Sequence, residues 1–134
     1  MLHIAICDDN PFLLELTEEC LKECCANILP ESLEYEILES FGSAEEVLEY
    51  LSHDPIDVLF SDIDMPGLNG YELAEKIRET NKEMVIVFVS GYDRPTRDTS
   101  GINLCGSIKR DRLDRDLPGV IKRLGNRPGI ETRS

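Results

Sequence analysis

The feature that most constrains the fold is a regular alternation of short apolar runs with amphipathic segments. "LHIAIC" at 2–7 and "EMVIVFVSG" at 83–91 have the length and apolar content of buried strands. "PFLLELTEECLKECCANI" at 11–28 instead repeats apolar side chains at helical spacing. The expected order is strand 2–7, helix 11–28, strand 33–41, helix 43–51, strand 56–62, helix 69–79, strand 83–90, weak strand 104–108 and helix 113–124. This rhythm predicts right-handed βαβ units in an α/β fold with a doubly wound parallel sheet.

The alternation of strand-like and helix-like segments is interrupted between residues 92 and 112. This segment contains Pro95, Gly101 and Gly106 and has almost no apolar periodicity in its first half. We therefore expect the fourth helix of the fold to be short or irregular.

The last expected helix, 113–124, contains Pro118. Because proline is tolerated only near the first turn, this helix is expected to begin near Asp114 or to be kinked. The polar residues that follow are rich in glycine and proline, so 125–134 is expected to be a flexible tail or linker stub after a domain at 1–124.

The charge of the chain is strongly negative and unevenly distributed. The 134 residues carry a formal net charge of -13. Residues 1–93 contribute -18 and residues 94–134 contribute +5. Such a balance argues against direct nucleic-acid binding by this domain. The basic C-terminal part is interpreted first as a solvated helix face, with an acidic partner as the alternative.

Five cysteines are present: Cys7, Cys20, Cys24, Cys25 and Cys105. No C-x-x-C pair or nearby histidine completes a zinc set, so we interpret them as small apolar side chains. An odd count without a signal peptide is typical of reduced thiols in the cytoplasm, and no apolar run is long enough to span a membrane.

Polar side chains stand at the ends of four expected strands. Asp8 and Asp9 follow the first strand, Asp62 ends the third, Ser90 the fourth and Lys109 the fifth. In an open parallel sheet these positions meet at the carboxyl edge, where ligands bind. Three crowded carboxylates require a proton or a cation, and a set of oxygen ligands favours Mg²⁺. With a hydroxyl and an ammonium beside them, the group could hold a phosphoryl moiety, which a carboxylate can also accept covalently.

Each residue also has a simpler interpretation. Asp8 and Asp9 could cap the following helix, Asp62 and Ser90 could be turn residues, and Lys109 could be one more solvated cation. The joint occurrence of all of them favours a site.

The segment "MPGLNG" after Asp62 is expected to form a tight loop beside that residue. Its glycines suit left-handed backbone or close approach of two backbone segments. Asn69 and Glu72 have the spacing of a capping box for the next helix.

Over residues 2–124 the chain resembles the receiver domain of two-component response regulators. The motifs that carry the resemblance are "CDDN", "SDIDMPGLNG", "VSGY" and "IK", one after each of strands one, three, four and five. The resemblance implies a flavodoxin-like five-stranded sheet of order 2-1-3-4-5. It also implies phosphoryl transfer from a sensor histidine kinase to an aspartate, with Mg²⁺ bound.

The resemblance implies a role for each matched position. Asp62 corresponds to the phosphoacceptor, Ser90 to the switch hydroxyl and Lys109 to the lysine that contacts the phosphoryl group. The implied metal ligands are Asp8, Asp9, Asp62 and the backbone carbonyl of Asp64. Such a domain is a signalling switch, with at most slow self-phosphorylation and dephosphorylation rather than enzymatic turnover.

Within the family, the chain is most similar to receivers that precede a LytTR-type DNA-binding domain, which implies an output domain in a longer chain and control of transcription. It departs from the family pattern in three ways. Gly106 stands where an aromatic is common, Arg110 replaces the usual proline, and the segment from 90 to 109 is short. Oligomeric state is left open as monomer or dimer.

Two other functions are weighed. A degenerate receiver would act only as an interaction module. Asp62 and Asp64 also resemble the D-x-D of haloacid-dehalogenase-type phosphatases. That motif fits less well, because Asp8 and Asp9 precede it and Pro66 stands two residues after Asp64.

Overall fold

The computed structural model describes residues 1–92 and 97–126. The strands are β1 (Leu2–Cys7), β2 (Tyr35–Ile37), β3 (Val58–Ser61), β4 (Val85–Ser90) and β5 (Gly106–Lys109). The helices are α1 (Pro11–Ile28), α2 (Ala44–Leu51), α3 (Gly70–Thr80) and α4 (Leu113–Gly125), with the 3₁₀ turns η1 (Ser100–Ile102) and η2 (Arg110–Arg112). All strand pairs are parallel and the order is β2-β1-β3-β4-β5, which confirms the expected fold.

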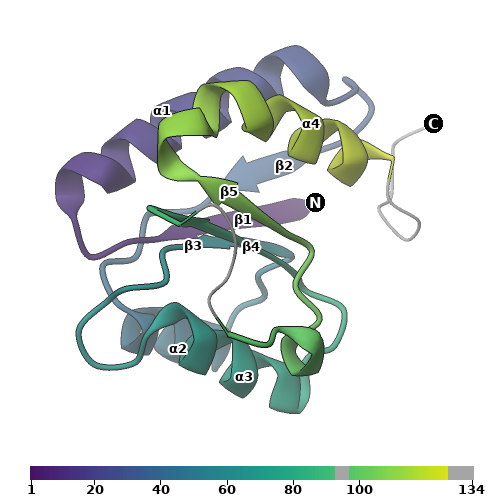
Figure 1. The fold of residues 1–134 in the computed structure, drawn as a ribbon. Helices are drawn as coiled ribbons and strands as arrows, with labels where there is room; N and C mark the ends of the chain where they lie inside the picture. Colours follow the sequence, from purple (N-terminus) through teal and green to yellow (C-terminus); the bar gives the residue numbers. More distant parts are fainter. Residues whose placement is uncertain (93–96, 127–134) are drawn as a thin grey trace.

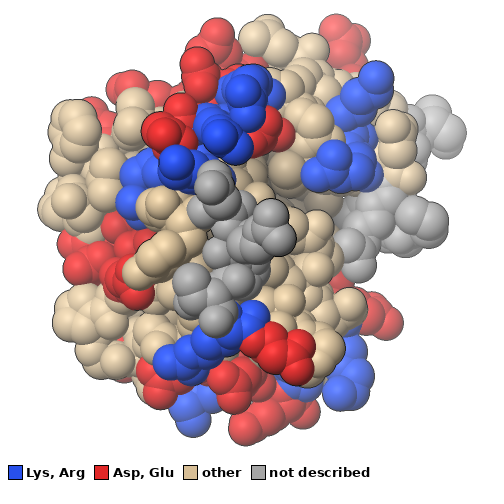
Figure 2. All heavy atoms as spheres, viewed as in Figure 1, with Lys and Arg blue, Asp and Glu red and all other residues tan. Residues whose placement is uncertain are grey.

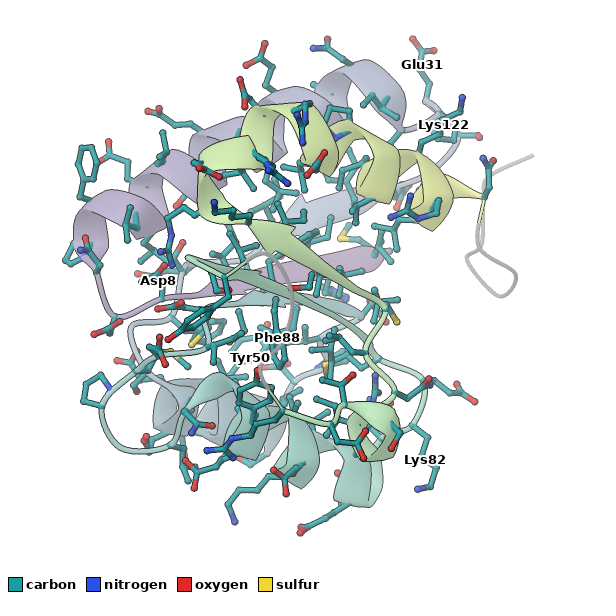
Figure 3. The ribbon with its side chains drawn as sticks, in the orientation of Figure 1. Asp8, Glu31, Tyr50, Lys82, Phe88 and Lys122 are labelled. Atoms are coloured by element: carbon teal, nitrogen blue, oxygen red, sulfur yellow. The ribbon has the colours of Figure 1, made fainter. Side chains whose placement is uncertain are left out.

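The sheet separates two apolar layers. Figure 1 shows α1 and α4 on one face of the sheet and α2 and α3 on the other. Strand residues alternate between the layers: Phe60 packs under α1 and α4, whereas Phe88 packs under α2 and α3. Figure 3 shows Phe88 projecting from β4 into the lower layer, with Asp8 at one edge of the sheet. Strands buried on both faces explain the near-continuous apolar runs in the sequence.

The edge strand β2 is shorter than the expected strand 33–41. Only 35–37 pairs regularly with β1. Beyond it the chain still bonds to β1, with Leu38 N donating to Ile4 O at 2.8 Å and Phe41 N donating to Ile6 O at 2.9 Å. The spacing of these two bonds breaks the ladder, so the segment stays extended without being a continuous strand.

The connection from β4 to β5 contains no α-helix among its described residues, as expected for a short or irregular fourth helix. It forms the 3₁₀ turn η1, and Asn103 then takes a left-handed φ of 48°. The buried Arg78 of α3 fixes this turn, because it donates to Ile102 O at 2.6 Å and to Asn103 O at 3.1 Å. Cys105 N donates to Ile86 O at 2.9 Å and leads the chain into β5.

Helix α4 begins at Leu113 and continues through Pro118. This start agrees with the expected helix at 113–124 and with a beginning near Asp114. Pro118 lacks the N–H that would bond to the carbonyl of Asp114. Because Asp114 is exposed, water can solvate this carbonyl oxygen instead. The proline is therefore tolerated one turn into the helix.

Three of the cysteines, Cys7, Cys24 and Cys25, are buried as expected of small apolar side chains. Cys105 is exposed on the β4–β5 connection, which differs from that interpretation. No helix in 1–92 or 97–126 is long and apolar enough to cross a bilayer. Of the expected tail, 127–134 lies outside the described residues.

Candidate functional site

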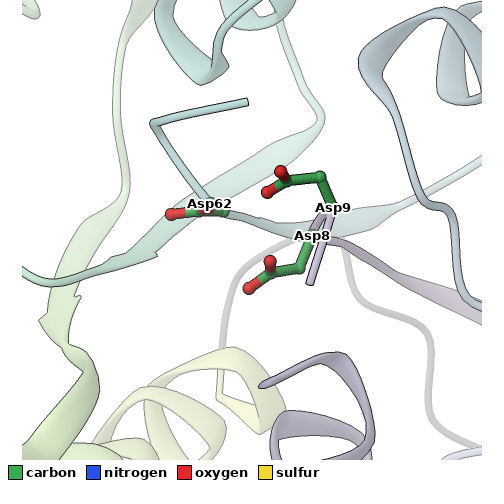
Figure 4. Close-up of side chains that lie close together, drawn as sticks. All are labelled: Asp8, Asp9 and Asp62. Atoms are coloured by element: carbon green, nitrogen blue, oxygen red, sulfur yellow. The ribbon is translucent and has the colours of Figure 1, made fainter. Parts of the chain in front are cut away.

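The ends of β1 and β3 bring the predicted carboxylates together. Cys7 pairs with Ser61 in the register of the two strands, so Asp8 and Asp62 leave the sheet at the same level. One oxygen from each of Asp8, Asp9 and Asp62 lies within 4.8 Å of the others. Figure 4 shows the three side chains gathered at this edge. The structure therefore unites the residues that the sequence analysis chose as metal ligands through their side chains.

Short local hydrogen bonds orient the two buried carboxylates. Asp8 is 4% exposed, and its Oδ1 accepts from the backbone N–H of Asn10 at 2.9 Å. Asp62 is 8% exposed, and its Oδ1 accepts from the N–H of Ile63 at 2.8 Å. Asp9 is exposed at the mouth of the pocket. Both buried oxygens are thus fixed by the backbone immediately after each strand.

Burial makes the charged form of these carboxyls costly. It raises the pKa of Asp8, and it raises the pKa of Asp62, where the negative charge of Asp8 adds to the shift. A cation in the pocket would oppose both shifts. The donor set consists of carboxylate oxygens, which suits Mg²⁺, and the exposed Asp9 leaves one side open to water ligands. The residues present therefore fit a divalent metal.

The structure also places a cation in the pocket that the sequence analysis did not assign. Arg110 Nη2 lies 3.0 Å from Asp62 Oδ1 and 3.5 Å from Asp8 Oδ2. It also lies 3.5 Å from the carbonyl oxygen of Val89. The sequence showed Arg110 only as one basic residue among several after β5. Its position directly after the last strand residue was the available signal.

Ser90 and Lys109 lie at the same edge, one strand further along. They are paired in the register of β4 and β5. Ser90 is buried, and its Oγ accepts from the N–H of Tyr92 at 3.2 Å. Lys109 Nζ lies 3.5 Å from Asp111 Oδ2, and the lysine side chain is 31% exposed. The sequence analysis placed both residues at strand ends correctly, while their contacts with a phosphoryl group stay a prediction.

Asp64 lies in the loop after β3, and its side chain faces Tyr92. A hydrogen bond to the Asp64 carboxylate raises the pKa of the exposed Tyr92 phenol. This bond joins the loop after β3 to the residues after β4. The role of the Asp64 backbone carbonyl as a metal ligand stays a prediction.

The loop between β3 and α3 has the expected backbone features. Gly67 has a φ of +76°, a conformation that favours glycine. Gly70 packs against the backbone of Asp62 and Ile63 so closely that a Cβ would collide with it. Asn69 Oδ1 accepts from Glu72 N at 2.9 Å, and Glu72 Oε1 accepts from Asn69 N at 3.0 Å, which confirms the capping box. Together these features fix the backbone that carries Asp62.

Basic side chains of the C-terminal part of the chain lie close together on the surface, as their concentration in residues 94–134 suggests. Figure 2 shows lysine and arginine side chains gathered over α4 and the turn before it, in the upper part of this face. The basic residues described there are Lys109, Arg110, Arg112, Arg115, Lys122 and Arg123. Elsewhere in this view acidic side chains are scattered over a mostly uncharged surface, and further basic side chains lie among them in the lower part. The acidic pocket therefore borders the basic part of the molecule.

A model of the response regulator receiver domain matches residues 4–104, so the chain belongs to that family. The fold and the acidic pocket agree with this assignment.

Among curated proteins, the chain is 32% identical over 92 residues to the transcriptional regulatory protein NatR of Bacillus subtilis, covering 69% of this chain and 36% of NatR. It is 25% identical over 97 residues to the transcriptional regulatory protein YpdB of Escherichia coli K12, covering 72% of this chain and 40% of YpdB. The chain thus spans less than half the length of these two relatives.

Solved structures show the same fold. The response regulatory domain of MrkE from Klebsiella pneumoniae matches with a TM-score of 0.78 and 20% identity, over 93% of this chain and 96% of that chain. The response regulator TrrA of Thermotoga maritima, solved in complex with Mg²⁺-BeF, matches with a TM-score of 0.75 and 28% identity, over 92% of this chain and 99% of TrrA.

Proposed function

We propose that Asp62 of this receiver domain accepts a phosphoryl group from the phosphohistidine of a sensor histidine kinase, in a reaction that requires Mg²⁺. The observation that carries the proposal is the convergence of Asp8, Asp9 and Asp62 within 4.8 Å at the carboxyl edge of the sheet. Membership of the receiver family and the similarity to TrrA, which was solved with Mg²⁺-BeF, support it.

The metal would be held by Asp8, Asp9, Asp62 and the backbone carbonyl of Asp64. When bound, it would supply positive charge that neutralises the crowded carboxylates and the oxygens of the transferring group. Oxygen ligands on two strand ends, with one exposed carboxylate, suit such an ion.

Asp62 would act as the nucleophile. Its Oδ1 is held by Ile63 N and by Arg110, which leaves Oδ2 to attack phosphorus. A lone pair of Oδ2 forms the new O–P bond, while the P–N bond of phosphohistidine breaks and its electron pair stays on the departing imidazole. Lys109 and Ser90, paired at the ends of β5 and β4, would then contact the phosphoryl oxygens.

Intact-mass measurement after incubation with acetyl phosphate and Mg²⁺ tests this function. We expect the wild type to gain the mass of one phosphoryl group and Asp62→Asn to gain none. Asp54→Asn is the matched control, because it makes the same chemical change at an exposed residue before β3. It should label like the wild type. Wild-type protein that takes no label, or Asp62→Asn that labels normally, would contradict the proposal.

A second candidate function is an interaction module that works without phosphorylation. The presence of Arg110 at the phosphoacceptor and of Gly106 in β5 favours it. The test is binding of the phosphate analogue BeF₃⁻ with Mg²⁺. If neither the wild type nor Asp62→Asn binds it, the interaction module is the function that remains. A phosphatase of the haloacid-dehalogenase type would instead release phosphate continuously from an ester, so a single stoichiometric label argues against it.

We propose further that residues 1–124 form the receiver unit, followed by a linker at 125–134, in a longer cytoplasmic regulator. NatR and YpdB are transcriptional regulatory proteins that extend well beyond the matched part, which supports an output domain acting on transcription. A LytTR-type DNA-binding domain is the specific output that the sequence motifs favour. The net charge of -13 supports leaving DNA contact to that output domain.

A further inference from the structure

Arg110 has an unusual place in the acidic pocket. Its Nη2 lies between two carboxylates that belong to different strands, 3.0 Å from Asp62 Oδ1 and 3.5 Å from Asp8 Oδ2. The arginine side chain is 21% exposed, and the two aspartate side chains are 10% and 5% exposed. These are contacts within a mainly buried site, where charges interact more strongly than they do on the surface.

The guanidinium does for these carboxylates what a metal ion would do. The positive charge of Arg110 lowers the pKa of both Asp8 and Asp62 and so opposes the effect of burial. A divalent ion that used the same two residues would approach a fixed positive charge. Both cations therefore draw on the same negative charge and oppose each other.

The position of Arg110 in the chain allows it to leave. It is the first residue of η2, the 3₁₀ turn between β5 and α4, and its side chain reaches the pocket from there. Its Nε is buried and makes no hydrogen bond within the described part of the chain. The guanidinium is thus held mainly by the two carboxylates, and an ion that takes these away removes most of what keeps it in place.

We propose that Arg110 is a tethered counter-cation of the phosphoacceptor pocket and that it competes with Mg²⁺ for Asp8 and Asp62. The inference rests on the proposed function, because it assumes that Mg²⁺ binds there. It adds that the metal affinity of the unphosphorylated domain is set by an arginine of the β5–α4 junction. Mg²⁺ binding then releases this arginine, so the start of α4 senses the metal before any phosphoryl group arrives.

A Mg²⁺ titration at constant ionic strength, followed through the backbone amide resonances of Asn10 and Ile63, tests the competition without a phosphoryl donor. Arg110→Met keeps most of the side-chain length and removes the charge. We expect it to bind Mg²⁺ about tenfold more tightly than the wild type, the scale of one close charge–charge interaction in a partly buried site. Arg115→Met is the matched control. It removes the same charge from the first turns of α4, where Arg115 is exposed and contacts Asp116.

The competition is supported if Arg110→Met tightens binding and Arg115→Met changes it by less than about twofold. Equal affinities for wild type and Arg110→Met, or weaker binding by the variant, would overturn it. If the wild type and Arg110→Met bind Mg²⁺ equally well and both take the phosphoryl label, only the role of Arg110 as a counter-cation is refuted. The proposed function of Asp62 then stands. Absence of Mg²⁺ binding in both proteins would overturn this inference, and the labelling of Asp62 then decides the proposed function separately.

A second measurement needs no variant and therefore does not depend on whether Arg110→Met folds. The side-chain Nε–H resonance of Arg110 in the wild type reports the surroundings of the guanidinium. We expect it to shift with Mg²⁺ concentration along the same saturation curve as the amide of Ile63. An Nε–H resonance that stays unchanged while the amide titrates would show that the arginine remains in place, against the proposal.

Discussion

The pocket at the ends of β1 and β3 and the connection that leads from β4 to α4 are held in different ways. In the pocket, Asp8 bonds to the backbone two residues away and Asp62 to the next residue. In the connection, Arg78 holds Ile102 from 24 residues away. Local backbone bonds thus orient Asp8 and Asp62, which Arg110 also reaches from 102 and 48 residues away, whereas the turn before β5 is fixed by bonds from a distant helix.

Because the two regions are held by different bonds, a substitution in one can be expected to leave the other largely intact. The pocket needs two strand ends, a tight loop and a helix cap, and the sequence supplies each within a few residues. The connection depends instead on the distant side chain of Arg78, which bonds to the carbonyl oxygens of Ile102 and Asn103. The predictions below test whether the regions are separable in this way.

Gly70→Ala should have the largest effect, because it displaces the backbone that carries Asp62. The new Cβ would collide with the carbonyl of Asp62 and approach Ile63 Cα to 2.9 Å. We expect a loss of about 3 kcal/mol in the free energy of unfolding, measured by urea denaturation. Gly101→Ala is the control in the other region, since no atom lies within 4 Å of its added Cβ. Equal effects of the two substitutions would contradict the prediction.

Arg78→Ala should disturb the connection and spare the pocket. It removes the donors to the carbonyl oxygens of Ile102, Asn103 and Asn81. We expect a cost of about 2 kcal/mol in the free energy of unfolding, because the buried carbonyl of Ile102 loses its partner together with two partly buried carbonyls. Hydrogen exchange should accelerate at 102–105, while the Mg²⁺ affinity of the pocket stays within about twofold of the wild type. A large change in that affinity would show that the two regions are coupled.

Asn69→Ala should weaken the start of α3 by a smaller amount. The substitution removes the bond from Glu72 N, at 2.9 Å, and its expected cost is about 1 kcal/mol in thermal or urea unfolding. Helix α4 has no side-chain cap at its start, so the two helices begin with different local support. Asn126→Ala, after the end of α4, is the control and should be close to neutral. A neutral Asn69→Ala would mean that packing alone fixes the loop beside Asp62.

The smallest expected effect is the pH dependence that the pocket contributes without metal. The pKa of Asp62 is raised above 3.8 in the folded state, so the folded protein binds protons more readily there than the unfolded chain does. This contribution to stability is complete below the unfolded pKa and is lost as pH rises through the folded pKa. Relative to Asp62→Asn, the metal-free wild type should therefore become more stable as pH falls from 7 toward 4. Unfolding curves at several pH values measure this difference, and a trend of opposite sign would refute it.

The same division separates what the sequence predicted from what it missed. The strand runs and their terminal aspartates predicted the sheet, its carboxyl edge and the cluster of Asp8, Asp9 and Asp62, because strand periodicity and parallel pairing determine all three. The capping box of Asn69 is equally local. Regular pairing in β2 ended early because an edge strand has only one partner to hold it.

Arg110 was not recognised because its contacts are 48 and 102 residues away in the chain. A row of basic residues after β5 gives no indication of which side chain turns inward. The path of Arg110 from η2 to the pocket depends on how the sheet, the turn and α4 pack together. Contacts of this kind appear only in the assembled structure.

The uneven burial of the thiols has a practical consequence for observing this domain. Burial raises the pKa of Cys7 and of Cys25 to about 12 and that of Cys20 to about 11, so these sulfurs stay protonated and slow to react at neutral pH. Cys105 is the exposed thiol, at the entry to β5. A maleimide dye or spin label added to the unmodified chain should attach there first, and it would report movement of the β4–β5 connection when the pocket is filled.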